Sequence, residues 1–420
     1  MHFLKHSILP ILLIVTLSMS AGSVAIIYDT PGQFLYSGGM QTTSVDPNDS
    51  MIIIATSNIV LDLGGNIFFA GQDSAPGFTG ITIAPNVYNV TIKNGIVAGF
   101  TGNGIRINDG CYDIFIDNIT TTLCADAGIN SLGSLSGIMD VVIKNCTISD
   151  CMPGLASVAA GIHANNTTRM RISNCYFEGN QLILCPSSAG VHLENSSVFE
   201  LLENRTVGQR AASFAAGYML ENCTEGIVKN CLAYATTTTG DGTDSVYGFY
   251  MSASERIWIN NCQSVAGKSE TGKCIGFFTT GGSRNIFEKV LAQSDQGKLE
   301  TAGISLASES SSYINDSIIR GIVSTNESAY GIKLDATCSL CHIEENLVSN
   351  NSGSSAFGIV DLSAQSSSLI VKNECFNSGT HYLVSYPGFS IPVINGSLSN
   401  PAPGLPAQVC GTFDNVSVTI

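Results

Sequence analysis

GITIAPNVYNVTIKNGIV, residues 80–97, is the segment that decides the fold, because its pattern returns along most of the chain. It contains a glycine, a short strand in which apolar and polar residues alternate, a turn, and a second alternating strand that ends in asparagine. The segments GIRINDGCYDIFIDNITT (104–121), GIHANNTTRMRISNCYFE (161–178) and GYMLENCTEGIVKNCLAY (217–234) follow the same plan. Self-similarity at a period of about 20–50 residues is typical of repeat proteins, in which each unit packs on the next.

The glycine that opens each unit recurs at intervals of 24 to 33 residues. It lies at Gly80, Gly104, Gly128, Gly161, Gly190, Gly217, Gly248, Gly276, Gly303, Gly331 and Gly358. The next residue is apolar in every unit: Ile81, Ile105, Ile129, Ile162, Val191, Tyr218, Phe249, Phe277, Ile304, Ile332 and Ile359. One unit cannot bury such a residue alone, so neighbouring units must supply the core. The pattern therefore predicts an all-β solenoid of stacked parallel coils, about 11–13 in number.

Asparagine recurs where the second strand ends, a position that favours a residue tolerant of left-handed backbone geometry. These asparagines are Asn94, Asn118, Asn145, Asn174, Asn204, Asn230, Asn261 and Asn373. Stacked amides at such turns form an asparagine ladder, and in this the chain resembles the pectate-lyase-like right-handed parallel β-helix superfamily. The opening segment from Ser57 to Asn66 is also similar to that superfamily's first coil. The resemblance covers nearly the whole chain after its N-terminal segment and implies a right-handed helix.

The ends of the chain differ from the repeats. Lys5 and His6 precede an apolar run that is too short to cross a bilayer, and small residues follow, so we expect residues 1–22 to be a signal peptide. Residues 23–50 are predicted to cap the N-terminal end, residues 51–386 to form the β-helix, and the proline-rich residues 387–420 to form an extended tail. The expected product is secreted or held at the cell surface without a transmembrane anchor.

The net charge of −15 and a pI near 4.7 disfavour nucleic acid and anionic membranes as partners. An acidic surface repels polyanions and tolerates Ca²⁺, so a neutral polysaccharide or cell-surface glycan fits better than a polyuronate. The sequence firmly implies no cofactor and shows no metal-binding motif, although Ca²⁺ is compatible with it.

Two outward columns of the first strand carry the candidate catalytic residues. Alternation places Arg106, His163 and His192 in one column, and Glu194 and Glu221 in the next. Like charges stacked on adjacent strands oppose folding by roughly 0.2–1 kcal/mol per pair, so keeping them indicates a site with shared protons or a bound cation. Carboxyl groups about 5 Å apart also suit a retaining glycosidase. The alternative is a solvated strand face whose polar residues have no such role.

Enzyme signatures of the resembling families are absent from the sequence. The polygalacturonase elements Asn-Thr-Asp, Asp-Asp, Gly-His-Gly and Arg-Ile-Lys do not occur. Tyr247-Gly248-Phe249 is similar to the start of a mannuronan epimerase motif, but Tyr250-Met251-Ser252 replaces its Asp-Pro-His. Arg256–Asn261 is similar to a pectate lyase segment, but Asn260 and Asn261 replace its Asp and His. These replacements remove acid–base groups.

Aromatic residues on outward positions are candidates for stacking on sugar rings. Trp258 and Phe115 lie on the second strand of their units, and Tyr250 lies on the first. Loops that cover the two second-strand rings are the alternative. The longest connections, at residues 149–160, 178–189 and 235–246, are expected to rise beside the outward patch.

The cysteines have two interpretations in an exported chain. Cys146 and Cys175 follow ladder asparagines on neighbouring units, as do Cys231 and Cys262, but parallel stacking gives a poor disulfide torsion, so we expect buried thiols. The segment 338–342, Cys-Ser-Leu-Cys-His, fits a haem attachment pattern. Alternation points its second cysteine inward and its histidine outward, which opposes a haem.

Three functions remain open at this stage: a glycan-binding surface protein, which the missing signatures favour; a polysaccharide lyase, glycoside hydrolase or epimerase with an unusual site; and a purely structural surface protein. The fold does not choose among them, because function lies in sites grafted onto folds.

Overall fold

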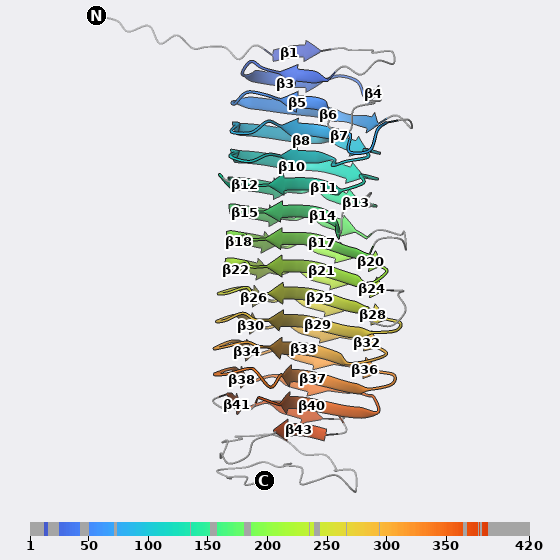
Figure 1. Cartoon of the computed structure of the whole chain (residues 1–420), viewed down its shortest axis with the longest axis vertical. Helices are drawn as coiled ribbons and strands as arrows, with labels where there is room; N and C mark the ends of the chain where they lie inside the picture. Colours follow the sequence, from blue (N-terminus) through green and yellow to red (C-terminus); the bar gives the residue numbers. More distant parts are fainter. Residues whose placement is uncertain are drawn as a thin grey trace, which may run out of the picture.

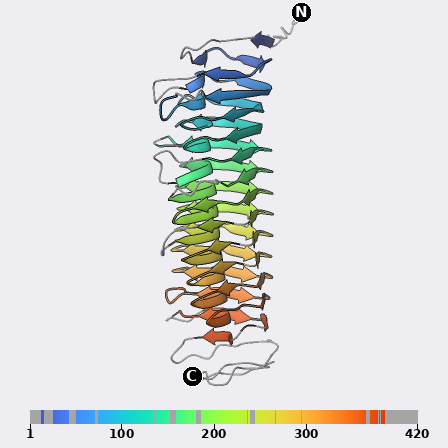
Figure 2. The ribbon, with the colours of Figure 1, turned by 90° about the vertical axis from the view of Figure 1, so that its right-hand side faces the viewer.

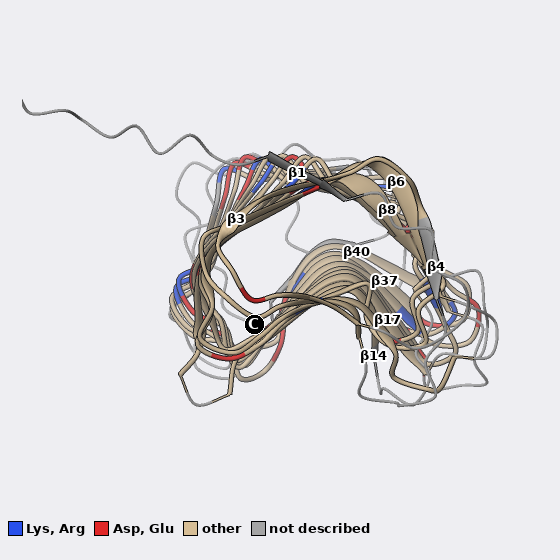
Figure 3. Cartoon of the chain, turned by 90° about the horizontal axis from the view of Figure 1, so that it is seen from above, with Lys and Arg blue, Asp and Glu red and all other residues tan. Residues whose placement is uncertain are grey.

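The structure, a computed structural model, is one long stack of parallel β-coils that run from the N-terminal to the C-terminal end of the molecule (Figures 1 and 2). It describes residues 12–15, 25–42, 50–70, 74–134, 136–151, 158–179, 186–234, 236–238, 244–265, 267–293, 295–363, 368–376, 378 and 380–384. Seen along the stack, the ribbons surround one interior (Figure 3). In the described residues, no helix is long and apolar enough to span a membrane.

In the described part of the chain, the strands form three parallel sheets of 14, 24 and five strands. The 14-stranded sheet contains β2 (Ile26–Tyr28), β5 (Ser50–Ile54), β7 (Thr79–Ile83), β9 (Ile105–Ile107), β11 (Ala127–Leu132), β14 (Val158–Asn165), β17 (Ser187–Glu194), β21 (Phe214–Glu221), β25 (Ser245–Ser252), β29 (Lys273–Thr280), β33 (Thr301–Ala307), β37 (Ser328–Leu334), β40 (Ser355–Asp361) and β43 (Thr380–Val384). The five-stranded sheet contains β20 (Arg210–Ala211), β24 (Thr237–Thr238), β28 (Lys268–Ser269), β32 (Gln296–Gly297) and β36 (Val323–Ser324).

The 24-stranded sheet contains the second and third strands of the coils. They are β1 (Leu12–Val15), β3 (Gly32–Tyr36), β4 (Met40–Thr42), β6 (Ile59–Ala70), β8 (Tyr88–Ala98), β10 (Tyr112–Thr122), β12 (Ile138–Lys144), β13 (Thr147–Ser149), β15 (Thr167–Ser173), β16 (Tyr176–Glu178), β18 (Ser197–Leu202), β19 (Arg205–Val207), β22 (Thr224–Lys229), β23 (Leu232–Tyr234), β26 (Trp258–Asn260), β27 (Gln263–Val265), β30 (Ile286–Glu288), β31 (Leu291–Gln293), β34 (Tyr313–Asn315), β35 (Ile318–Arg320), β38 (His342–Glu344), β39 (Leu347–Ser349), β41 (Leu369–Val371) and β42 (Glu374–Phe376).

The apolar column predicted from the sequence is confirmed residue by residue. Ile81 pairs with Ile105, and the same register continues through each of the eleven glycine-led units to Ile332 and Ile359. Each side chain of the column is at most 2% exposed. Tyr218, Phe249 and Phe277 stack ring on ring, with centroids 4.7 Å apart at each step. The core is therefore continuous from coil to coil.

The repeated glycine is required by close packing. A Cβ added to Gly161 would lie 2.6 Å from the carbonyl oxygen of Gly190 and 2.6 Å from the ring of Phe177. The strand pairing of β14 with β17 joins the residues on both sides of Gly161 but not the glycine itself. The glycine thus allows the strand to pass close to the next coil and to the core.

The predicted asparagine column is divided between two neighbouring turn positions. Asn94, Asn118 and Asn261 have left-handed backbone angles, and the amide of Asn118 donates to the side chain of Asn94 at 3.0 Å. Asn204 and Asn373 instead lie one residue later and are buried, because Glu203 and Lys372 occupy the left-handed position before them. The left-handed asparagines lie at the surface or are half-buried. The expectation of a single column was therefore wrong for Asn204 and Asn373.

The described part of the expected N-terminal cap continues the stack. β2 pairs with β5, and β3 and β4 both pair with β6, so these strands extend the same sheets. β1 lies in the expected signal peptide and pairs with β3. The proposed boundaries at residues 22 and 50 stay predictions, and the expected tail at 387–420 lies outside the described residues.

The cysteines predicted to be buried thiols are buried and unbridged in the structure. They are Cys146, Cys175, Cys231 and Cys262. In the haem-like segment, Cys341 points into the core, whereas His342 is partly exposed and its Nε2 lies 3.4 Å from Glu344. The two side chains therefore face opposite sides of the strand, as alternation predicts.

Candidate functional site

The outer face of the 14-stranded sheet gathers four of the five candidate catalytic residues. His163 on β14 pairs with His192 on β17, and Glu194 on β17 pairs with Glu221 on β21. Each pair lies on adjacent strands at the same register, as the sequence predicts. We call these four residues the histidine–glutamate cluster.

The inner part of the cluster is a hydrogen-bonded pair. The Nε2 of His192 lies 2.8 Å from Oε2 of Glu221. The His192 side chain is only 6% exposed, while that of Glu221 is 30% exposed. A carboxylate can only accept this hydrogen bond, so Nε2 of His192 carries the proton. In the neutral ring, Nδ1 then carries a lone pair, and it is buried without a hydrogen-bond partner.

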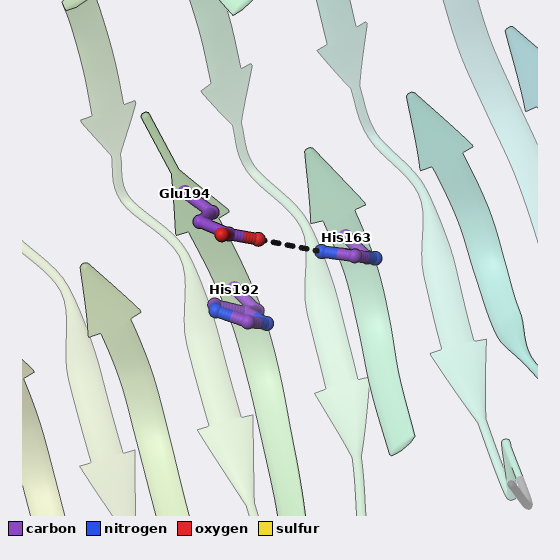
Figure 4. A group of neighbouring side chains, drawn as sticks. All are labelled: His163, His192 and Glu194. Carbon is purple, nitrogen blue, oxygen red and sulfur yellow. Dashed lines mark ion pairs between the residues drawn. The ribbon is translucent and has the colours of Figure 1, made fainter. Parts of the chain in front are cut away.

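The outer part of the cluster is more open. The rings of His163 and His192 stack with centroids 4.8 Å apart, and Nε2 of His163 lies 3.9 Å from Oε2 of Glu194 (Figure 4). The amide of Asn165 donates to that same Oε2 at 3.1 Å, and the amide of Asn195 donates to Oε1 at 3.3 Å. Glu194 is therefore held by two amides while its Oε2 faces a histidine.

The electrostatics keep His163 neutral at physiological pH. The pKa of His163 is lowered to about 4, mainly by burial and also by the neighbouring His192, although Glu221 acts in the opposite direction. Its Nε2 is buried and has no hydrogen-bond partner, since 3.9 Å is too long for a hydrogen bond to Glu194. The cluster thus holds two ring nitrogens without partners and two carboxylates.

Arg106 is not brought into the cluster. It is exposed on β9 and pairs with Asn130, which in turn pairs with His163, so two further strands separate it from His192. The carboxylate it influences is Asp126, whose pKa is raised mainly by burial and lowered by Arg106. The shared column was predicted correctly, but a role for Arg106 beside the two glutamates does not fit this distance along the stack.

An aromatic patch adjoins the cluster on the same face. Met219 connects the two, because it pairs with His192 on one side and with Tyr250 on the other. The patch consists of Phe214, Tyr247, Tyr250 and Phe278. Its ring centroids lie 5.0 to 5.7 Å apart, and all four rings except Tyr247 are partly exposed.

The patch contains one sequence-predicted residue and three that the sequence analysis missed. Tyr250 was predicted, whereas Phe214, Tyr247 and Phe278 were not. Tyr247 lies one residue before the repeated glycine. The same position in later coils holds Tyr330 and Phe357, so the sequence contains a recurring aromatic signal there. This column lies just before the glycine that opens each predicted unit, so it fell outside the repeat pattern.

Trp258 and Phe115 lie on the 24-stranded sheet, away from Tyr250. The indole N–H of Trp258 donates to Glu288 at 3.1 Å, and the Lys144 ammonium lies 4.8 Å from the centre of the Phe115 ring. Both rings face outward, but they do not form one surface with Tyr250. The three expected connecting loops lie largely outside the described residues, at 152–157, 180–185 and 239–243.

The comparisons agree with the architecture. Residues 79–265 match the family described as "Right handed beta helix region". Among curated protein sequences, none matches this chain. The chain is a right-handed parallel β-helix, as the resemblance implied.

Two solved structures illustrate the similarity. A mutant tailspike protein of E. coli bacteriophage HK620 in complex with a pentasaccharide is 12% identical, with a TM-score of 0.50 and coverage of 85% of this chain and 72% of the tailspike chain. A mutant of the periplasmic alginate epimerase AlgG is 11% identical, with a TM-score of 0.46 and coverage of 84% of this chain and 76% of the epimerase chain. At such identity the likeness to the tailspike shows the fold alone.

Proposed function

We propose that this right-handed parallel β-helix protein is exported and binds a neutral glycan on the outer face of its 14-stranded sheet. The glycan would contact the aromatic patch and extend over Met219 to the histidine–glutamate cluster. The observation that carries the proposal is the placement of partly exposed rings directly beside unpaired polar groups on one regular face.

The aromatic patch supplies the apolar part of the site. Sugar rings present C–H faces that pack on aromatic faces, and tyrosine adds a hydroxyl for hydrogen bonding. Phe214, Tyr250 and Phe278 are partly exposed, although the other outward aromatic of the patch, Tyr247, is 7% exposed. Burial raises the pKa of Tyr247 to about 12, so its hydroxyl stays protonated and can donate.

The cluster supplies the polar part. Glu194 and Glu221 accept hydrogen bonds from sugar hydroxyls, and the partly exposed His163 offers a ring nitrogen without a partner. Two carboxylates together with a net charge of −15 repel a polyuronate, so a neutral glycan is favoured. The HK620 tailspike, which has a similar fold, was solved with a pentasaccharide, so a β-helix of this kind accommodates an oligosaccharide.

A carbohydrate-active enzyme is the second candidate, and the pairing of Glu194 with Glu221 favours it. Neighbouring strands lie about 4.7–4.9 Å apart, and retaining glycosidases place two carboxyl groups about 5–5.5 Å apart. The hydrogen bond from His192 would orient the Glu221 carboxylate as the nucleophile, and Glu194 would then take the general acid–base role.

One experiment separates the candidates. The purified protein is incubated with a panel of insoluble neutral and acidic polysaccharides, and both retention on the solid and release of reducing or unsaturated ends are measured. Retention of a neutral glycan without products supports the binding protein. Products that disappear in a His192→Ala/Glu194→Gln variant establish the enzyme. Retention on no member of the panel contradicts both and leaves a structural surface protein.

Export has its own test. Mass spectrometry of the protein recovered outside the cytoplasm should give a mature N-terminus between residues 20 and 25, as the run of small residues predicts. Recovery of the protein only inside the cell, with Met1 still present, would contradict export.

A further inference from the structure

We propose that His163, His192 and Glu194 bind one transition-metal ion of the zinc class on the outer face of the 14-stranded sheet. The inference goes beyond glycan binding and does not depend on it, because it rests on the ligand atoms alone.

The three side chains already lie close together. One ring nitrogen of each histidine and one carboxylate oxygen of Glu194 are within 4.8 Å of one another (Figure 4). Zinc–ligand bonds of about 2.0–2.1 Å in a tetrahedron require donor separations of roughly 3.3 Å. The Nε2 of His163 and Oε2 of Glu194, now 3.9 Å apart, would approach by roughly 0.6 Å. Donors as far apart as 4.8 Å would approach by up to about 1.5 Å, through rotation of the partly exposed side chains of His163 and Glu194.

The second observation is the unsatisfied state of the histidines. Nδ1 of His192, whose residue is 5% exposed, has no hydrogen-bond partner, and neither does Nε2 of His163. Leaving a buried polar atom without a hydrogen-bond partner destabilises the folded chain. A metal ion would satisfy both lone pairs at once.

The surroundings resemble the outer shell of a metal site. Glu221 accepts a hydrogen bond from the Nε2–H group of His192 at 2.8 Å, which fixes the tautomer that leaves Nδ1 free to bind. Metal-binding histidines usually donate their other nitrogen to a carboxylate in this way. Asn165 and Asn195 hold the Glu194 carboxylate from two sides, so its orientation is set before any ion arrives.

The donor set selects the metal. Imidazole nitrogen suits zinc, copper, nickel and cobalt, whereas Ca²⁺ takes six to eight oxygen ligands. Two nitrogens and one carboxylate also leave a fourth position open for water or a substrate oxygen. His163 and Glu194 are 27% and 34% exposed, so that position faces solvent. No local metal-binding motif marks the site, because His163 on β14 lies 29 residues before His192, which shares β17 with Glu194.

Isothermal titration calorimetry of the chelator-treated full chain with ZnCl₂ tests the proposal. We expect one equivalent of Zn²⁺ to bind saturably at pH 7.5 and millimolar Ca²⁺ to give no comparable binding. Glu194→Gln and His163→Gln, both at partly exposed positions, should each weaken Zn²⁺ binding by at least about 100-fold. Glu221→Gln should weaken it by about 10–100-fold, because this residue positions a ligand rather than binding the ion.

A matched control lies on the other sheet. His342 and Glu344 are a histidine–glutamate pair with Nε2 and Oε2 3.4 Å apart, and His342 is 32% exposed. His342→Gln should leave the Zn²⁺ affinity unchanged. Circular dichroism and denaturant unfolding confirm that each variant is folded. Absence of saturable Zn²⁺ binding, or equal affinity of the folded wild type and Glu194→Gln, would overturn the proposal.

Discussion

The same strands form both sides of the 14-stranded sheet, but the residue types on the two sides are distributed differently. On the inner side, one apolar residue follows another from Ile81 to Ile359, and aliphatic and aromatic residues replace each other without a change of register. On the outer side, chemistry is segregated: polar groups gather at β14, β17 and β21, and aromatic rings gather at β21, β25 and β29. The inner side therefore specifies the fold, and the outer side holds the histidine–glutamate cluster and the aromatic patch of the proposed site.

The largest difference between the two sides is expected when a charge is introduced on each of them in separate variants. Ile162→Asp places a carboxylate in the continuous core, where Ile162 is 0% exposed, and should cost at least about 4–5 kcal/mol of the free energy of unfolding. Thr280→Asp, at an outward position of β29, should stay within about 1 kcal/mol of wild type. Denaturant unfolding measures both. Similar losses for the two variants would contradict the division of the sheet.

Asp295, just before β32 of the five-stranded sheet, is a natural exception to the apolar interior, because its carboxylate is buried. It is 0% exposed, Oδ1 accepts the Gly267 N–H at 3.0 Å, and Oδ2 has no partner. Burial raises the pKa of Asp295 from 3.8 to about 8. Below pH 4 the folded and unfolded chains both hold this proton, so titration costs nothing. As the pH rises from about 4 to about 8 the unfolded chain releases the proton first, and stability falls by on the order of 4 kcal/mol by pH 7.

Asp295→Asn removes this titration and should be more stable than wild type at pH 7, with the difference shrinking toward pH 4. Guanidinium unfolding at several pH values measures the difference. Asp244→Asn is the matched control, because this buried carboxylate accepts hydrogen bonds from Thr238, Ser269 and Thr271, and its replacement should destabilise the protein. A pH-independent difference between wild type and Asp295→Asn would refute the raised pKa.

The smallest expected effect is at a turn of the 24-stranded sheet, between β30 and β31. Lys289 has a left-handed backbone angle, with φ of 55°, at the turn position that Asn230 and Asn261 occupy in their own coils. A left-handed backbone costs a residue with a Cβ roughly 1–2 kcal/mol, and asparagine tolerates it better. Lys289→Asn should therefore raise the free energy of unfolding by about 0.5–1 kcal/mol, measured by urea denaturation. Destabilisation of the same size would show that the turn selects lysine for another reason.

The fold was predictable because the alternation of apolar and polar residues indicates which side chains face the core, and the repeated glycine indicates where each coil begins. These two signals placed Ile162 inward and His163 outward, and the pairing of His163 with His192 followed. The asparagine turns were less predictable, because the pattern does not distinguish the left-handed position from the buried one after it. Asn204 and Asn373 fell on the second of these.

The candidate site was predictable only in part. A column gives the order of residues along the stack but not which of them touch, so Arg106 was grouped with His192 across intervening strands. The aromatic patch combines columns on both sides of the repeated glycine: the Tyr247 ring, one residue before it, lies 5.0 Å from the Tyr250 ring, two residues after it. Such a junction has no signature within a single repeat.

The central claim is that the outer face of the 14-stranded sheet, and not the outer face of the 24-stranded sheet, binds the glycan. Retention on the glycan selected from the panel should be compared for two folded double variants, Tyr250→Ala/Phe278→Ala and Phe115→Ala/Trp258→Ala. Because stacking on each aromatic ring contributes about 0.5–1.5 kcal/mol, the first variant should bind about 5- to 150-fold more weakly than wild type and the second should bind equally well. Loss of binding in the second variant with full binding in the first would contradict the account.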